Sequence, residues 1–195
     1  MLECPDGLRA LADHYADDPV LLTLGGTIRE MLSVAGRRMN HLYLLDAMGQ
    51  PAAIGLGLAL GLRDTSRYDK VVVVEGDGSL LMGLSSLATI GHLAPPNLVL
   101  IVFDNGVYLA TGGQPTAAAS ADYAAIALAC GWGAARDIDG DLDDFREGMA
   151  WADSQPGPVL LRVKVSTNVP ATDFYLADPV VLASEFTEWL HRSDD

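Results

Sequence analysis

Apolar residues along the chain form short continuous runs, which are separated by longer segments with helical spacing. The two clearest runs are VVVV (Val71–Val74) and LVLIVF (Leu98–Phe103). Continuous runs rich in β-branched residues are typical of parallel strands that are buried on both faces, whereas half-exposed strands alternate apolar and polar residues. Further strands are predicted at Pro19–Leu24, His41–Leu45 and Pro158–Val165.

Between these runs, apolar residues recur at helical spacing. The segment 25–36 ends at a glycine, a common helix stop, and Pro51–Leu62 starts with a proline and contains small residues suited to close packing. Further helices are predicted over residues 6–16, 79–93, 121–133 and 185–192. Because strands alternate with helices, we expect a three-layer α/β fold, in which helices cover both faces of a mainly parallel sheet.

Length and charge narrow the class of protein. The 195 residues fit one domain, which we expect to span residues 1–195. The net charge of −14 argues against nucleic acids and anionic membranes as partners. No apolar run reaches the roughly 18 residues of a membrane span. The acidic N-terminal segment lacks the apolar core of a signal peptide, so we expect a cytoplasmic protein.

Three other features have ordinary interpretations. Cys4 and Cys130 are too few for a disulfide framework or a metal cluster, and we expect two unpaired thiols. DIDGDLDDF (Asp137–Phe145) lacks the spacing and the closing Glu of a calcium loop, and it predicts a solvated turn that leads into a helix. GLGLALG (Gly55–Gly61) has alternating glycines inside a helical pattern, which favours helix packing over a nucleotide-binding loop.

Polar residues directly follow the two clearest strands. Gly76, Asp77 and Gly78 come after VVVV, and Asn105 comes after LVLIVF. In an open parallel sheet, ligands bind beyond the carboxyl ends of the strands, so we expect these residues to share a site. Glycines let a ligand approach the backbone, the helix that begins at Ser79 offers free N–H groups to a phosphate, and carboxylate and amide oxygens suit Mg²⁺. The sequence therefore predicts a magnesium ion between the protein and a diphosphate.

Three segments carry a resemblance to a known family. GDGS at 76–79, followed by DN at 104–105, resembles the diphosphate-binding motif of thiamine-diphosphate-dependent enzymes. DAMGQPAAIGLGLAL at 46–60 resembles the segment of that family that holds the two cofactor rings. DNGVYLATGGQPT at 104–116, with GTIREM and GPVLLRVKV, is similar to one branch of its decarboxylases, the β subunit of sulfopyruvate decarboxylase and the C-terminal half of phosphonopyruvate decarboxylase.

This resemblance implies roles for individual residues. Asp77 and Asn105 would bind Mg²⁺ through their side chains, and Val107 would bind it through its carbonyl. Met48 would hold the cofactor rings in a bent shape, and the carbonyl of Asp46 would accept a hydrogen bond from the 4′-amino group. Cofactor contacts are implied at Asp46, Met48, Gly76, Asp77, Gly78, Ser79, Asn105, Val107 and Tyr108.

The chain also departs from the pattern of this branch. Asp46-Ala47 stands where Gly-Ser is usual, which adds a carboxylate beside the implied cofactor site. Ala110 replaces a small hydroxyl residue. In the family, the acid–base glutamate comes from a separate pyrimidine-binding domain. No glutamate of this chain has a matching context, because Glu75 precedes the GDG motif and Glu30 lies on a predicted helix.

The resemblance therefore implies a hetero-oligomer, in which a pyrimidine-binding α subunit supplies the glutamate. It implies a small anionic 2-oxo acid as substrate, first of all sulfopyruvate, which would give sulfoacetaldehyde and CO₂. The alternatives are half of a phosphonopyruvate decarboxylase, a carboligating relative, or a cofactor-binding or regulatory module without turnover. No catalytic residue of this chain is certain. Candidates are Arg29, which would hold a sulfonate or phosphonate, and His41; their ordinary roles are a surface arginine and a packed histidine.

Overall fold

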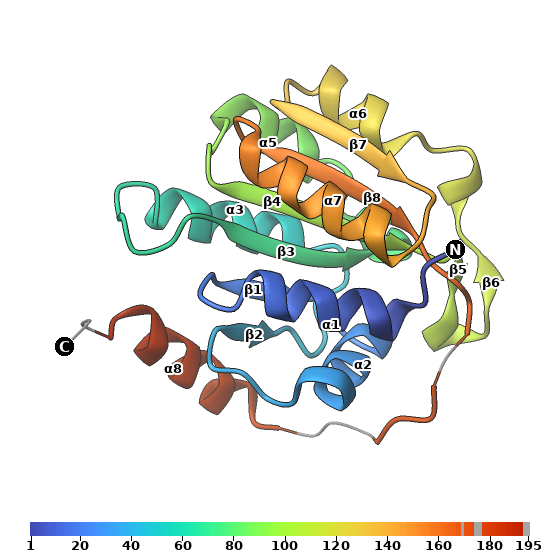
Figure 1. Cartoon of the computed structure of the whole chain (residues 1–195), viewed down its shortest axis with the longest axis horizontal. Helices are drawn as coiled ribbons and strands as arrows, with labels where there is room; N and C mark the ends of the chain where they lie inside the picture. Colours follow the sequence, from blue (N-terminus) through green and yellow to red (C-terminus); the bar gives the residue numbers. More distant parts are fainter. Residues whose placement is uncertain (169, 174–176, 193–195) are drawn as a thin grey trace.

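A computed structural model describes residues 1–168, 170–173 and 177–192 of the chain. Its centre is a parallel sheet with the strand order β2-β1-β3-β4-β8-β7 (Figure 1). An antiparallel hairpin of β5 and β6 lies outside this sheet. The strands are β1 Val20–Leu22, β2 His41–Tyr43, β3 Val71–Gly76, β4 Leu98–Asp104, β5 Val107–Tyr108, β6 Gln114–Pro115, β7 Ala134–Ile138 and β8 Val159–Lys164.

Helices cover both faces of the sheet, which confirms the predicted α/β architecture. Side chains of α1, α2, α7 and α8 pack in the core on one face, and those of α3, α4, α5 and α6 pack in the core on the other. The α-helices are α1 Cys4–His14, α2 Gly26–Ala35, α3 Pro51–Gly61, α4 Asp77–Met82, α5 Ser86–Leu93, α6 Tyr123–Ala129, α7 Leu142–Ser154 and α8 Pro179–Leu190. Two short 3₁₀ turns, Leu109–Thr111 and Ala117–Ala119, flank β6.

The central strands show why their sequences are continuously apolar. Val72 and Val74 of β3 face the core beneath α1 and α2, whereas Val71 and Val73 face the core on the other side. All four valines are fully buried. Since both faces of the strand are covered, neither set of alternating positions can be polar without the loss of buried apolar area.

The direction of the strand order reverses between β1 and β3. From β1 the chain moves outward to β2, and it then returns to β3 on the other side of β1. The loops that leave the carboxyl ends of β1 and β3 therefore diverge, and such a reversal is where open α/β sheets bind ligands. Thr23 follows β1 and Asp77 follows β3, so the GDG motif lies at this crevice.

The helix predicted over 79–93 is interrupted in the structure. α4 ends at Met82 and α5 begins at Ser86. The backbone of Gly83 packs against that of Gly49, because a Cβ added at Gly83 would stand 2.0 Å from the carbonyl oxygen of Gly49. This contact ties the loop before α3 to the end of α4, and it brings Met48 toward the GDG motif.

Other differences lie at the edges of the fold. The edge strand β7 was not predicted, because its middle residues are polar and exposed; it takes in the first two residues of DIDGDLDDF. The rest of that segment is the expected turn and helix start, where Asp141 and Asp144 form a reciprocal cap of α7. The hairpin of β5 and β6 was also not predicted. The tail helix predicted over 185–192 is α8, which begins six residues earlier, at Pro179.

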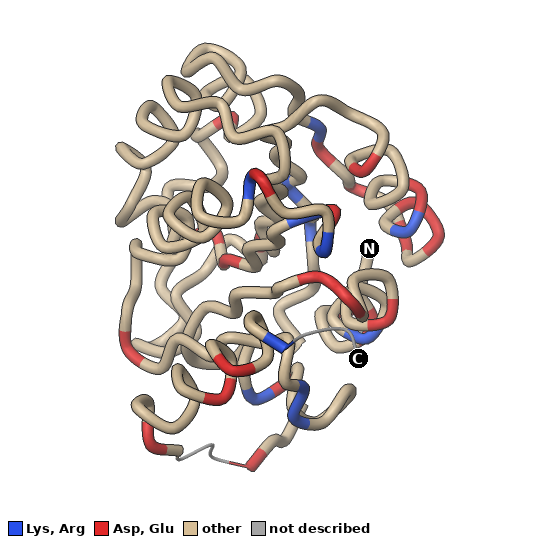
Figure 2. Tube along the Cα trace, turned by 90° about the vertical axis from the view of Figure 1, so that its left-hand side faces the viewer, with Lys and Arg blue, Asp and Glu red and all other residues tan. Residues whose placement is uncertain are grey.

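The surface agrees with the acidic composition. Asp and Glu recur along many helices and loops of the trace, while Lys and Arg are fewer (Figure 2). Within the described ranges, no helix combines the length and apolarity needed to cross a membrane. Cys4 and Cys130 are free thiols, as expected.

Candidate functional site

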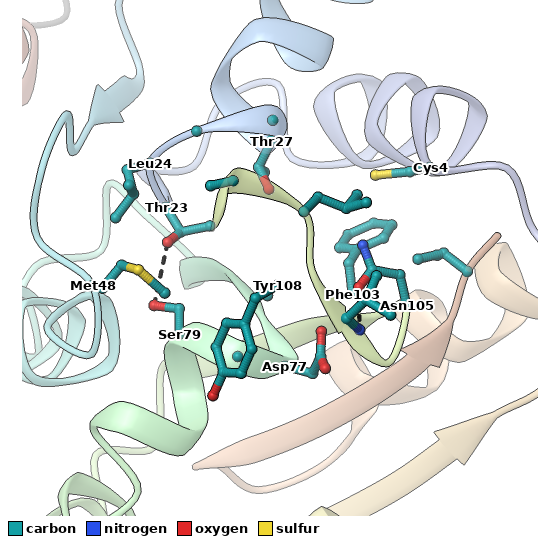
Figure 3. A pocket seen from close by; sticks show the side chains of 18 of the residues that line it. Cys4, Thr23, Leu24, Thr27, Met48, Asp77, Ser79, Phe103, Asn105 and Tyr108 are labelled. Atoms are coloured by element: carbon teal, nitrogen blue, oxygen red, sulfur yellow. Dashed lines mark hydrogen bonds between the residues drawn. The ribbon is translucent and has the colours of Figure 1, made fainter. Parts of the chain in front are cut away.

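A cavity of about 420 Å³ opens at the carboxyl ends of β1 and β3. Met48 and Leu24 lie at one end of it, Cys4 and Phe103 lie at the other, and Asp77 lies between them (Figure 3). Its lining comes from the segments that follow β1, β2, β3, β4 and β8, from the β5–β6 region, and from the starts of α1 and α2. Segments that are remote in the sequence therefore meet at the crevice that the strand order predicts.

Asp77 is the first residue of α4, and only 2% of it is exposed. Its carboxylate accepts a hydrogen bond of 2.5 Å from the hydroxyl of Thr116, and others from the backbone N–H groups of Gly78 and Asn105. Burial raises the pKa of Asp77, the Thr116 hydroxyl acts in the opposite direction, and the nearby charge of Asp104 raises the pKa further. Burial and the charge of Asp104 both disfavour the ionised form of Asp77. A bound cation would stabilise that form, so the site suits a divalent metal ion.

Asn105 and Val107 lie in a tight turn that follows β4. The Oδ1 atom of Asn105 accepts a hydrogen bond from the N–H of Val107 at 3.0 Å. Asp104 holds the same turn, since its Oδ1 accepts from the N–H of Gly106 at 2.9 Å and its Oδ2 accepts from Nε of Arg162 at 2.7 Å. All three predicted metal ligands line the one cavity.

The hydroxyl of Ser79 forms hydrogen bonds with three other segments of the chain. It donates to Oε1 of Glu75 at 2.7 Å, and its oxygen accepts from the N–H of Gly49 at 3.0 Å and from the hydroxyl of Thr23 at 3.4 Å. Ser79 also lines the cavity, but its hydroxyl already forms hydrogen bonds with these protein groups, and its contact with a cofactor stays a prediction. Glu75, which directly precedes the GDG motif, is 1% exposed and is therefore not a solvated surface acid.

Glu75 gives a pH-dependent prediction. Burial raises the pKa of Glu75 from 4.5 to about 7, against the opposing effects of the Ser79 hydroxyl and the N–H of Ala52. The folded chain thus keeps a proton that the unfolded chain releases, so Glu75 makes the free energy of unfolding fall as pH rises from about 4.5 to about 7. Between these pH values, the free energy of unfolding of Glu75→Gln should rise relative to that of wild type by up to about 3 kcal/mol.

Urea unfolding of wild type and Glu75→Gln at pH 5 and pH 8, in a metal chelator, measures this effect. Glutamine keeps an oxygen that can accept the Ser79 hydrogen bond, so the comparison isolates the ionisation. If the difference between the two proteins is the same at both pH values, Glu75 does not titrate as the structure indicates.

The other cofactor contacts implied by the resemblance divide into two groups. Met48, Gly76, Gly78 and Tyr108 line the cavity. A Cβ added at Gly78 would stand 2.4 Å from the Tyr108 ring, so only glycine fits there, whereas one added at Gly76 would meet nothing within 4 Å and its backbone is open to a ligand. Asp46 is exposed and is not part of the lining.

The structure does not bring the two catalytic candidates to the cavity. Arg29 is half-buried on α2, where its Nε donates to the carbonyl of Gly25 at 3.4 Å, and it is not a lining residue. His41 begins β2, at the amino ends of the strands rather than their carboxyl ends. It is 2% exposed, and burial, helped by the charge of Arg38, lowers its pKa to about 4. His41 is thus a packed, neutral histidine.

Three site residues were missed by the sequence. Thr116 bonds Asp77 across 39 positions of sequence; it belongs to the GGQPT segment that carries the resemblance, which was the one available signal. Cys4 lies at the end of the cavity opposite Met48 (Figure 3), and Glu30, which interacts with Cys4, also lines the cavity. Neither had a recognisable motif, because α1 and α2 bring them together only in the folded chain.

The residues present fit a magnesium ion and a diphosphate. Asp77, Asn105 and Val107 offer carboxylate, amide and carbonyl oxygens, which are hard ligands. Gly25 and Gly76 have no atom within 4 Å of an added Cβ, so the wall there is open backbone. None of the lining residues, all of which belong to the described part of the chain, is Lys, Arg or His. A phosphate group in this cavity would therefore depend on a metal ion for neutralisation.

Comparison with known proteins defines the class to which this fold and site belong. Residues 29–163 match the family described as thiamine pyrophosphate enzyme, C-terminal TPP binding domain. The chain belongs to this family. Its fold is similar to that of benzoylformate decarboxylase from Polynucleobacter necessarius, with a TM-score of 0.69 and 19% identity over 84% of this chain and 33% of that one.

Two kinds of relative are closer in sequence. A phosphonopyruvate decarboxylase from Streptomyces viridochromogenes is 44% identical over 157 residues, which are 80% of this chain and only 38% of that protein. The β subunit of sulfopyruvate decarboxylase from Methanothermobacter thermautotrophicus is 36% identical over 176 residues, 89% of each chain. The corresponding subunit from Methanocaldococcus jannaschii is 31% identical over 96% of this chain and 97% of its own length.

Proposed function

We propose that this chain is the diphosphate- and Mg²⁺-binding β subunit of a two-subunit, thiamine-diphosphate-dependent 2-oxo-acid decarboxylase. The observation that carries the proposal is the convergence of Asp77, Asn105 and Val107 on one cavity in a member of this family. Bound thiamine diphosphate supplies an electron sink for the carbon that loses CO₂. The residues of this chain would hold the metal and the diphosphate, and Met48 would support the rings.

A partner subunit is supported by two observations. The β-subunit relatives match this chain over 89% and 97% of their lengths. In addition, two large apolar side chains that line the cavity are exposed: Met82 is 63% exposed and Leu109 is 44% exposed. A partner that covers these side chains would enclose the site, exclude water from it, and contribute the acid–base glutamate.

The substrate that we propose is 3-sulfopyruvate, with 3-phosphonopyruvate as the second candidate because of the 44% identity to a phosphonopyruvate decarboxylase. Both acids carry a second anionic group. Since the cavity lining contains no basic residue among its described members, the cation for that group would come from the partner.

The test is to recover the tagged chain from its own cells in the presence of thiamine diphosphate and Mg²⁺, and to weigh the intact complex by native mass spectrometry. We expect a stoichiometric second chain, and CO₂ release by the complex from 3-sulfopyruvate. Release from 3-phosphonopyruvate alone would reverse the order of the two substrates. A homo-oligomer that binds the cofactor but releases CO₂ from neither acid would favour a cofactor-binding module.

A further inference from the structure

Glu30 is a buried acid at the end of the cavity opposite Met48. It lies on α2, lines the cavity together with Cys4, and is 5% exposed. A Cβ added at Gly26 would stand 3.6 Å from its Oε1, so the side chain extends back toward the first turn of α2, where Gly26 also lines the cavity. Its Oε2 is buried, and no described group forms a hydrogen bond with it. A buried polar atom without a partner is costly, and it calls for an explanation.

The charges around the cavity determine whether an ionised or a neutral Glu30 is compatible with a bound ligand. Asp77 and Glu30 are the only charged residues in the lining, and the structure describes every lining residue. A magnesium diphosphate keeps net negative charge, and Asp77 adds to it. An ionised Glu30 in the same poorly solvated space would repel the ligand, whereas a neutral carboxylic acid would offer an O–H donor.

The groups that face Glu30 come from two helices. On α1, the Cys4 thiol hydrogen-bonds to the carboxyl; on α2 itself, Arg29 acts through its charge. Burial raises the pKa of Glu30 and outweighs the opposing effects of Cys4 and Arg29. Burial also raises the pKa of Cys4, and the nearby charges of Glu30 and then Glu3 raise it further. Cys4 therefore stays a neutral thiol and adds no charge to the cavity.

We propose that Glu30 binds an oxyanion at the Cys4 end of the cavity as a neutral carboxylic acid, which donates a hydrogen bond from its carboxyl group. Cys4 acts as a positioning residue, because its thiol orients the carboxyl. The oxyanion is a phosphate-type group, which is either the diphosphate of the cofactor or the sulfonate or phosphonate of the substrate. This inference rests on the proposed function, since it assumes that the cavity accepts these ligands.

Isothermal titration calorimetry of the chain, as recovered from its own cells, tests the inference. The probes are inorganic pyrophosphate with Mg²⁺, thiamine diphosphate with Mg²⁺, and 3-sulfopropionate added to the cofactor-loaded protein. The variants are Glu30→Ala and Glu30→Gln, with Glu147→Gln on the exposed side of α7 as the matched control.

We expect Glu30→Ala to weaken one oxyanion probe by about tenfold, the effect of one lost hydrogen bond to a charged group. Weaker pyrophosphate binding would identify the cofactor diphosphate as the ligand, and weaker 3-sulfopropionate binding alone would identify the substrate. Glu30→Gln, which keeps a donor, should bind within about threefold of wild type. Glu147→Gln should match wild type with every probe.

Unchanged affinity in Glu30→Ala for all probes would overturn the inference and leave the proposed function standing. A purely structural role for Glu30 would change the unfolding temperature of these variants without changing their affinity for any probe. If wild type binds none of the probes, the proposed function fails, and the inference fails with it.

Discussion

Asp77→Asn should weaken the Mg²⁺-dependent binding of thiamine diphosphate by at least about 100-fold, since even the loss of a group that only supports a metal ligand costs 10–100-fold. The substitution keeps the size of the side chain and one oxygen. It removes the only carboxylate among the three proposed oxygen ligands, and the Thr116 hydroxyl at 2.5 Å would lose its anionic acceptor. Titration calorimetry with and without Mg²⁺ measures the affinity.

Folding and binding can be separated in this experiment. Because burial raises the pKa of Asp77, its charge is disfavoured in the empty cavity, and Asp77→Asn should unfold at no lower urea concentration than wild type. Asp64→Asn is the matched control, since the Asp64 side chain is 92% exposed in the loop after α3. If Asp77→Asn binds the cofactor as tightly as Asp64→Asn does, the metal site is elsewhere.

Arg162→Met should lower the free energy of unfolding by about 3 kcal/mol, the lower end for a buried ion pair that loses one partner. Arg162 and Asp104 are 16% and 4% exposed, and both Nε and Nη2 of the guanidinium lie 2.7 Å from Oδ2 of Asp104. Asp137 and Asp139 lie farther away, each at 3.6 Å. Without the guanidinium, Asp104 remains as a buried charge without compensation.

The same substitution should also weaken metal binding at the proposed site, because Asp104 stabilises the turn that contains Asn105. Asp104 accepts the N–H of Gly106 beside Asn105, so we expect Mg²⁺ affinity to fall by roughly tenfold or more. Urea unfolding and metal titration are the two measurements.

A control variant and a double variant show whether the buried pair causes the loss of stability. Arg146→Met removes an exposed pair with Asp143 and should change stability by less than about 1 kcal/mol. Adding Asp104→Asn to Arg162→Met removes the stranded charge, and should restore part of the lost stability in a double-mutant cycle. Equal stability of Arg162→Met and Arg146→Met would show that the pair with Asp104 contributes nothing net.

The central fold could be predicted because its strands are buried on both faces. Val71–Val74 and Leu98–Phe103 are continuously apolar, since alternate side chains enter two different cores. β7 lacked this signal. It lies at the edge of the sheet, where its middle residues are exposed and polar, so the burial that marks the inner strands is missing.

Part of the site could also be predicted from the sequence. Asp77 and Asn105 directly follow two apolar runs, and parallel strands bring their carboxyl ends to one edge. The sequence did not show that Thr116 donates to Asp77, because that hydrogen bond depends on the path of the β5–β6 hairpin. The sequence did contain the information that separates His41 from the site, since a residue that begins a parallel strand lies at the amino ends of the sheet, opposite the ligand-binding edge.

By itself, therefore, the sequence determined the class of fold, and it placed Asp77 and Asn105 at the same edge of the sheet, where we propose that they bind a metal ion. Each of these follows from local order along the chain, namely an apolar run and the polar residues that come after it. Only the tertiary structure decided that Glu75 and Glu30 are buried acids, that Ser79 is committed to protein partners, and that Arg162 holds the turn of Asn105. Burial and pairing depend on which distant segments pack together, and that information is absent from any short stretch of sequence.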